Sequence, residues 1–365
     1  MTRIFGSAHR YFQGPDAIEH LGTILAPFGP TVLVIVDSLV REMIGGRVDA
    51  LLARDGVESV VRTFIGEITY PAIQALANSM TGSVPSVVVG IGGGKALDAA
   101  KGVCKLLDRP VVTVPTIASN DSPTSSLIAM YDSDHALIAV DRLARSPEAV
   151  IVDTALIARA PIRFLRAGIG DAISKKFEAE ACWHGTGSTP FGTRPTRTAI
   201  AIADACYRTI RAHGAAALAA AQAGNLTEDL EATIEAVILM SGLGFENGGL
   251  SLAHSLTRGL VKARGARDAI HGEHVAWGLL VQLAAEGRSS AEMRDALDLH
   301  RRLGLPVSLG ALGMPDPTVE EIAEIAKWTM TAPHLANLPV RVDQDGICRA
   351  IQAIENLAAA SSTGA

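Results

Sequence analysis

The sequence predicts an α/β domain with a doubly wound, Rossmann-like parallel sheet, followed by an all-helical domain. In roughly the first 160 residues, short runs rich in valine and isoleucine alternate with helical patterns, as in a parallel sheet with helices on both faces. After Pro161 these runs disappear, and long patterns rich in alanine and leucine follow. We therefore expect an α/β domain at 1–160 and a helical domain at 161–365.

Five short β-rich runs are expected to form the sheet. Most are unbroken apolar runs, which are typical of strands buried on both faces. They lie at residues 31–36, 58–64, 87–89, 111–114 and 149–152. Helices are expected between the turn at Gly14-Pro15 and the break at Gly29-Pro30, and again at 71–80.

The second half carries the helical patterns. Alanine and leucine dominate these segments, and few β-branched residues interrupt them. The expected helices lie at residues 171–184, 196–223, 228–243, 250–261, 272–286, 289–303 and 318–330.

A glycine turn follows the strand at 87–89. The segment 90–94 reads GIGGG, and a helical pattern begins at Lys95. A strand, a glycine turn and a helix start together expose backbone N–H groups to an anion. Lys95 stands where the dinucleotide fingerprint needs its third glycine, and Ala96 breaks the ATP-type loop. We favour phosphate or dinucleotide binding over a purely structural turn, although this motif does not name the ligand.

Polar residues also follow two neighbouring predicted strands. The run at 111–114 ends in the loop 115–121, so two strands of one parallel sheet would end close together, where such sheets bind ligands. Asp37 closes the strand at 31–36. It suits both an acceptor for a ribose hydroxyl and a helix N-cap, and its spacing favours neither.

Composition excludes several classes of function. The formal charge is −6 and aromatic residues make up 4%, which argues against a nucleic-acid surface. The N-terminus has no apolar signal-peptide core, and no stretch is long and apolar enough for a membrane span. The four cysteines form no C-x-x-C pair, which suits reduced thiols and a cytoplasmic location.

Three polar groups lie beside glycines in the helical half. Asp171 follows Gly168-Ile169-Gly170 and is expected to open a helix, His254 interrupts an apolar helix, and His271 stands at a helix start. Taken singly, each of these residues is better explained as a helix cap or a core histidine than as a metal ligand. Jointly, a carboxylate and imidazoles suit a zinc- or iron-type metal ion. His274 lies three residues after His271, so the pattern leaves it open which of the two takes part.

At these residues the chain resembles the metal-dependent, iron-containing type of alcohol dehydrogenase, and within that family the glycerol dehydrogenases. The resemblance covers nearly the whole chain and implies a dehydroquinate synthase-like architecture. Its motifs are YFQGPDAIEHLG at 11–22, GIGGGKALDAAKG at 90–102, PTIASNDSPTSSLIAMY at 115–131, VIVDTALIARAPIRFLRAGIGDAISKKFEA at 150–179, SGLGFENGGLSLAHSLTRGL at 241–260 and HGEHVAWG at 271–278.

The resemblance implies a metal site and a metal type. Asp171, His254 and His271 match the family's three ligands, and His274 falls where relatives often carry lysine. Longer relatives add a histidine one turn after the aspartate. Lys175 occupies that position here and, as an ammonium, cannot serve as a ligand. Zinc is the favoured ion and iron the alternative.

The resemblance also implies an NAD site and a substrate contact. Asp121 matches a position near the substrate, and we assign it a catalytic role. The expected pyrophosphate contacts are Gly92, Gly93 and Gly94. The other expected NAD contacts are Asp37, Lys95, Asp98, Thr116, Ser119, Ser125, Leu127 and Tyr131.

The implied reaction is NAD-dependent oxidation of glycerol and related vicinal diols, giving dihydroxyacetone from glycerol, in the cleft between the two domains. A homo-oligomer, an octamer in the family, is expected. The alternatives are the same chemistry on a 2-hydroxy or 2-oxo carboxylate, a dehydroquinate synthase-like lyase, an sn-glycerol-1-phosphate dehydrogenase, or a non-catalytic NAD-binding protein. Anionic substrates would need further cations. The candidates are Lys175, Lys176, Arg258 and Lys262, for which solvated helix surface is the expected role.

Overall fold

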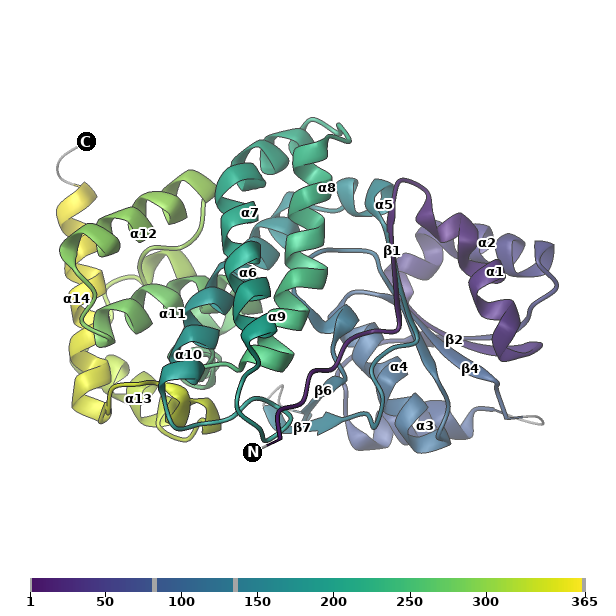
Figure 1. Cartoon of the computed structure of the whole chain (residues 1–365), viewed down its shortest axis with the longest axis horizontal. Helices are drawn as coiled ribbons and strands as arrows, with labels where there is room; N and C mark the ends of the chain where they lie inside the picture. Colours follow the sequence, from purple (N-terminus) through teal and green to yellow (C-terminus); the bar gives the residue numbers. More distant parts are fainter. Residues whose placement is uncertain (1, 81–83, 134–136, 363–365) are drawn as a thin grey trace.

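The computed structural model describes residues 2–80, 84–133 and 137–362 and contains a six-stranded parallel sheet (Figure 1). The strand order is β1-β8-β5-β4-β2-β3. This sheet confirms the predicted doubly wound α/β half. The strands are β1 (Arg10–Gly14), β2 (Thr31–Asp37), β3 (Glu58–Phe64), β4 (Val87–Gly92), β5 (Val111–Pro115) and β8 (Ala149–Asp153).

The chain reverses its direction across the sheet at β2. Strand β3 pairs with one side of β2 and strand β4 with the other. The carboxyl ends of β2 and β4 therefore flank the topological switch point, where open parallel sheets bind ligands. Asp37 ends β2 and Gly92 ends β4, so two predicted cofactor residues meet at this point.

Alternating residues of β2 fill two apolar clusters on opposite faces of the sheet. Val32 and Val34 belong to one cluster, whereas Leu33 and Ile35 belong to the other. Such double burial explains the unbroken apolar runs. The elements around the sheet are η1 (Ala17–His20), α1 (Leu21–Leu25), η2 (Ala26–Phe28), α2 (Ser38–Arg54), α3 (Tyr70–Asn78), α4 (Gly94–Leu107), η3 (Ser122–Thr124) and α5 (Thr154–Ala158).

From Ile162 on, every regular element of the described chain is a helix (Figure 1). These helices contribute most residues of the largest apolar cluster. They confirm the predicted helical half. The helices are α6 (Ile162–His184), α7 (Arg197–Gln222), α8 (Glu228–Glu235), the π-helical η4 (Ala236–Met240), α9 (Ser241–Gly248), α10 (Leu252–Leu260), η5 (Ala266–Asp268), α11 (His271–Ala285), α12 (Ser290–Leu303), η6 (Gly310–Leu312), α13 (Val319–Thr329), η7 (Pro333–Asn337) and α14 (Gln344–Ser362).

The structure corrects the prediction that Asp171 opens a helix. Helix α6 begins nine residues earlier, at Ile162, and Asp171 lies buried in its interior. Gly168 and Gly170 suggested a break, but both are helical because this part of α6 packs closely against its neighbours. Tertiary packing here outweighs the low helix propensity of glycine.

A further strand, a two-stranded hairpin and a helix were not predicted. Strand β1 pairs with β8, and β6 (Leu127–Tyr131) pairs antiparallel with β7 (Leu137–Arg142) in a separate hairpin. Helix α14 packs against α11 and α13 at the far end of the helical half (Figure 1). Strand β1 mixes polar and apolar residues, so it lacks the apolar run of the central strands. The hairpin strands carry the apolar runs LIAMY and LIAV but are only partly buried.

The N-terminal segment connects the two halves. Before β1 it lies against α9, where the Gly6 N–H donates to Asn247 Oδ1 at 2.7 Å and Asn247 Nδ2 donates to the Gly6 carbonyl at 2.9 Å (Figure 1). The first residues therefore contact the helical half although they precede the sheet in sequence.

Among the described residues, no single helix has both the length and the apolar composition of a membrane span. One pair, Glu228–Gly248 with Leu252–Leu260, meets the length and composition test only jointly and is bent by 100°.

Candidate metal centre and cofactor edge

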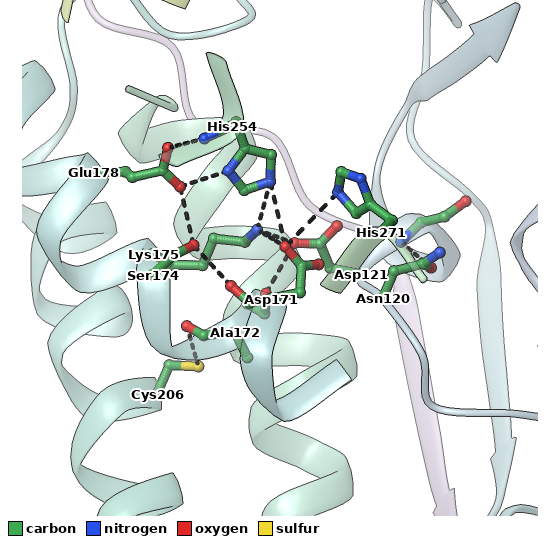
Figure 2. A network of polar contacts seen from close by, with 12 residues as sticks. Asn120, Asp121, Asp171, Ala172, Ser174, Lys175, Glu178, Cys206, His254 and His271 are labelled. Carbon is green, nitrogen blue, oxygen red and sulfur yellow. Dashed lines mark hydrogen bonds and ion pairs between the residues drawn. The ribbon is translucent and has the colours of Figure 1, made fainter. Parts of the chain in front are cut away.

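Three helices bring the predicted metal ligands together. Asp171 from α6, His254 from α10 and His271 from α11 offer ligand atoms that all lie within 4.8 Å of one another. Asp171 Oδ1 is 3.2 Å from His254 Nε2 and 4.0 Å from His271 Nε2 (Figure 2). Asp171 is buried, whereas the His271 side chain is 47% exposed. This set of one carboxylate and two imidazoles could hold a zinc- or iron-type ion.

Close backbone contact between α6 and α11 makes this arrangement possible. A Cβ atom on Gly272 would lie 1.9 Å from the Ala167 carbonyl oxygen, and one on Gly170 would lie 2.6 Å from the Gly272 carbonyl oxygen. Real side chains do not tolerate such distances. Glycine at both positions therefore lets the helices approach, and the adjacent residues Asp171 and His271 come within reach of one ion.

Glu178 orients His254 and was missed by the sequence reading. His254 Nδ1 lies 2.6 Å from Glu178 Oε2, and Glu178 Oε1 accepts backbone bonds from Ser251 and His254 at 2.7 and 3.1 Å. A carboxylate at Nδ1 leaves Nε2 to face Asp171 as a ligand. Burial is the largest influence and would raise the pKa of Glu178, but the charges of His254 and Lys175 and the hydrogen bonds to the carboxylate together outweigh burial and lower the pKa to about 2. Glu178 lies two helical turns after Asp171 on α6, a spacing that could have revealed it.

Lys175 is part of the same buried cluster, which corrects the expectation of solvated helix surface. Its ammonium lies 2.5 Å from Asp171 Oδ1, 3.2 Å from His254 Nε2 and 3.2 Å from Asp121 Oδ2 (Figure 2). Burial would lower its pKa, but the negative charges of Asp121 and Asp171 outweigh burial and raise it. Lys175 is therefore a buried ammonium one turn after Asp171.

The charges in this cluster fit a divalent cation. Asp121, Asp171 and Glu178 are buried carboxylates that surround a single ammonium. If all three are ionised and both histidines are neutral, as metal ligands must be, two negative charges remain uncompensated in a region of low dielectric constant, which is costly. A divalent ion among the three ligand atoms would neutralise this excess. The donor atoms and the charge balance thus agree with the metal that the sequence predicted.

Asp121 reaches the cluster from the sheet half of the molecule. It precedes η3, and its Oδ2 accepts a hydrogen bond from Ser241 Oγ at 2.8 Å. Ser241 directly follows the π-helical turn η4, and the Ile238 carbonyl of that turn accepts from Thr124 Oγ1 at 3.1 Å. Such wide turns are frequent at functional sites. Burial raises the pKa of Asp121.

His274 does not belong to the ligand set. It is buried, and its Nε2 lies 2.6 Å from the Ala266 carbonyl oxygen, so it acts as a core histidine that holds the turn before α11. The structure thus separates two histidines that spacing alone left open and of which the resemblance had favoured His271.

The glycine turn lies at the predicted cofactor edge of the sheet. Gly93 caps the N-terminus of α4 and Gly94 begins this helix. A Cβ on Gly94 would lie 2.8 Å from Asn120 Nδ2, so the turn and the loop after β5 are in close contact. Asp37 Oδ1 accepts from the backbone N–H of Leu39 and Val40 at 2.9 and 3.3 Å. Asp37 is therefore a helix N-cap, and its role toward a ribose stays a prediction.

The remaining predicted cofactor residues surround this edge. Asp98 is bonded inside the protein: Oδ1 lies 3.0 Å from Lys101 Nζ and 2.6 Å from Ser122 Oγ, and Oδ2 accepts from the Ala129 N–H. It therefore braces η3 and β6. Lys95 pairs with Glu67, and the Leu127 carbonyl accepts a hydrogen bond from Lys101. The backbone N–H of Thr116 donates to the Gly92 carbonyl, that of Tyr131 donates to the Ile68 carbonyl, and Ser119 and Ser125 are buried. The roles of all these residues toward a cofactor stay predictions.

A glycine turn at the ligand-binding edge of a parallel sheet, together with a set of metal-ligand side chains, is the arrangement expected of a metal- and dinucleotide-dependent enzyme. Residues 8–154 match the model of the iron-containing alcohol dehydrogenase family. The chain is 40% identical over 327 residues to a glycolaldehyde reductase of Halobacterium salinarum, with 90% of each chain covered. It is 39% identical over 329 residues to a glycerol dehydrogenase of Pseudomonas putida, covering 89% of this chain and 90% of that one.

A solved structure agrees with these relatives. The glycerol dehydrogenase of Schizosaccharomyces pombe superposes with a TM-score of 0.95 at 30% identity, covering 100% of this chain and 93% of that one. The chain belongs to the iron-containing alcohol dehydrogenase family. It is therefore an oxidoreductase, and family membership implies a nicotinamide dinucleotide and a divalent metal ion.

Proposed function

We propose that this protein catalyses the reversible NAD-dependent oxidation of glycerol and related vicinal diols, giving dihydroxyacetone from glycerol. The observation that carries the proposal is the junction of Asp121 with the ligand set of Asp171, His254 and His271. The Asp121 carboxylate suits the hydroxyl next to the reacting carbon of the substrate. The three ligands suit an ion that activates the reacting hydroxyl.

The protein's own groups have distinct tasks in this proposal. Asp171, His254 and His271 would hold the metal, which when bound supplies positive charge that favours the deprotonated alcohol. Glu178 keeps His254 in the required tautomer, and Ser241 holds the Asp121 carboxylate in place. Asp121 would accept a hydrogen bond from the hydroxyl next to the reacting carbon and thereby orient the diol.

The N-terminus of α4 would bind the other reactant. Gly93 and Gly94 offer backbone N–H groups at a positive helix end, which suits the pyrophosphate of NAD. Asp37 lies next to this turn, since a Cβ on Gly92 would be 3.0 Å from the Asp37 Cβ. Its carboxylate would accept ribose hydroxyls and repel a 2′-phosphate, which favours NAD over NADP.

Charge balance favours a neutral substrate over the anionic alternatives. A divalent ion already neutralises the buried cluster, so a 2-hydroxy carboxylate or a phosphate ester would need another cation. Lys176 pairs with Glu180 and Asp204, and Lys262 lies over the Trp328 ring at 4.3 Å. Arg258 donates to the Thr331 carbonyl at 3.0 Å. These contacts support the diol over the hydroxy acid, the phosphate ester and the lyase.

Glycolaldehyde reduction is a second candidate, because a 40% identical relative carries that name. Glycolaldehyde has a hydroxyl beside its carbonyl, and glycerol has hydroxyls on adjacent carbons. Both compounds are neutral and could use the same Asp121 contact. The two candidates thus differ in direction and in substrate length rather than in chemistry.

The test is NADH formation by the zinc-loaded protein with glycerol, 1,2-propanediol and a panel of 2-hydroxy acids, alongside NADH consumption with glycolaldehyde. Turnover of diols that a chelator abolishes and zinc restores is expected. Turnover confined to hydroxy acids would contradict the proposed substrate. Full activity after complete metal removal would contradict the metal site. Zinc as the native ion, a homo-octamer and a cytoplasmic location remain predictions.

A further inference from the structure

Lys175 competes for the atoms that would hold the metal. Its ammonium lies 2.5 Å from Asp171 Oδ1 and 3.2 Å from His254 Nε2, two of the three proposed ligand atoms (Figure 2). A zinc ion binds such oxygen and nitrogen atoms at about 2.0–2.2 Å. An ion on Asp171 Oδ1 would therefore lie no more than about 5 Å from the ammonium nitrogen, since the two distances can at most add.

Two cations this close in a buried site repel each other strongly. They would also need the same lone pairs, because Asp171 Oδ1 is the Asp171 oxygen that faces Nε2 of both histidines. The ammonium has another partner within reach, since Asp121 Oδ2 already lies 3.2 Å away. A small rotation of the lysine stem would move the charge from the ligand atoms to Asp121.

We propose that Lys175 is an internal counter-cation of the metal site, which holds Asp171 and His254 together on its own and which a divalent ion displaces toward Asp121. The inference rests on the proposed metal site. Lys175 thereby weakens metal binding and stabilises the metal-depleted protein. Asp121 receives the displaced charge, so the metal, the lysine and the substrate-orienting carboxylate act as one unit.

The test compares zinc affinity, measured by competition with a chromogenic chelator, in the full-length wild type and in Lys175→Met. Methionine keeps an unbranched stem but removes the charge. We expect Lys175→Met to bind zinc about tenfold more tightly or better. The metal-depleted variant should also unfold at a lower temperature than metal-depleted wild type, and zinc should restore its stability.

Lys176→Met is the matched control, because Lys176 is adjacent on α6 but pairs with Glu180 and Asp204 outside the cluster. Its zinc affinity should equal that of the wild type. Unchanged or weaker zinc binding by a folded Lys175→Met protein would overturn the proposal. A Lys175→Met protein that fails to fold even with zinc would also overturn it, because the ion should replace the ammonium.

Asp121→Asn supplies a second, independent measurement. With its acceptor weakened, the displaced ammonium has a poorer partner, so zinc binding should weaken in the presence of Lys175. In the Lys175→Met background the same change should have little effect. Equal effects in both backgrounds would contradict displacement toward Asp121. Failure of the wild type itself to bind zinc would instead contradict the proposed metal site, which separates the two outcomes.

Discussion

The two halves of this molecule build their sites in different ways. At the sheet edge, the phosphate-type site consists of backbone N–H groups from one continuous strand, turn and helix. In the helical half, the metal-type site consists of side chains from α6, α10 and α11, with Asp171 and His271 separated by 100 positions. The first site follows from local sequence, and the second depends on helix packing. Perturbing each site should therefore have different consequences.

The largest effect is expected for His254→Ala. It removes a proposed ligand and the imidazole partner of Glu178, a buried carboxylate that would keep only hydrogen bonds from Ser174 and from the backbone. Breaking such a buried pair costs about 3–5 kcal/mol, so both metal content and the free energy of unfolding should fall. Metal analysis would measure the loss of metal, and chemical denaturation would measure the loss of stability.

The comparison variant is His271→Ala, which removes the half-exposed ligand. We expect the same loss of metal, but the free energy of unfolding of the metal-depleted protein should change by no more than about 0.5 kcal/mol. A large loss of stability would show that His271 has a structural role that its exposure does not indicate.

Glu178→Gln should have the next largest effect, about 10–100-fold in metal affinity, because the amide keeps the shape but loses the charge that orients His254. Chelator competition measures this change. The KM for NAD should stay constant, since Glu178 lies in the helical half. A raised KM with unchanged metal affinity would refute the orienting role.

Gly94→Ala tests the other half. The added Cβ would lie 2.8 Å from Asn120 Nδ2 and would crowd the turn that is proposed to bind pyrophosphate. We expect about tenfold weaker NAD binding, of the order of a lost charge-assisted hydrogen bond, with metal content unchanged. Calorimetric titration with NAD would measure this affinity. Loss of metal in this variant would mean that the two sites are not independent.

The smallest effect separates the two roles of Asp37. Asp37→Ser keeps a side chain that can cap α2, whereas Asp37→Ala loses the cap at a cost of about 1 kcal/mol. If Asp37 also binds the ribose, both variants should lose discrimination against NADP, while only the alanine variant loses stability. Unchanged NAD preference in Asp37→Ser would leave Asp37 as a cap alone.

Particular residues show which parts of the fold were predictable. The strands at Thr31–Asp37 and Val87–Gly92 lie close to their predicted positions, because full burial produces unbroken apolar runs. Strand β1 was missed because it mixes polar with apolar residues. The β6–β7 hairpin was missed although LIAMY and LIAV are apolar runs, and both of its strands are only partly buried. The interior position of Asp171 in α6 was misread, because glycine was taken as a helix break where it instead permits close packing.

The sequence by itself determined the fold class, the glycine turn and the three residue types that suit a metal, because these depend on local patterns and chemistry. Spacing alone could not separate His271 from His274, which the resemblance did. The tertiary structure supplied the physical reason, since each histidine takes its role from its neighbours. It also revealed Glu178 and placed Lys175 in the cluster rather than on the surface. Burial and partners arise from packing between distant helices, and no local pattern records them.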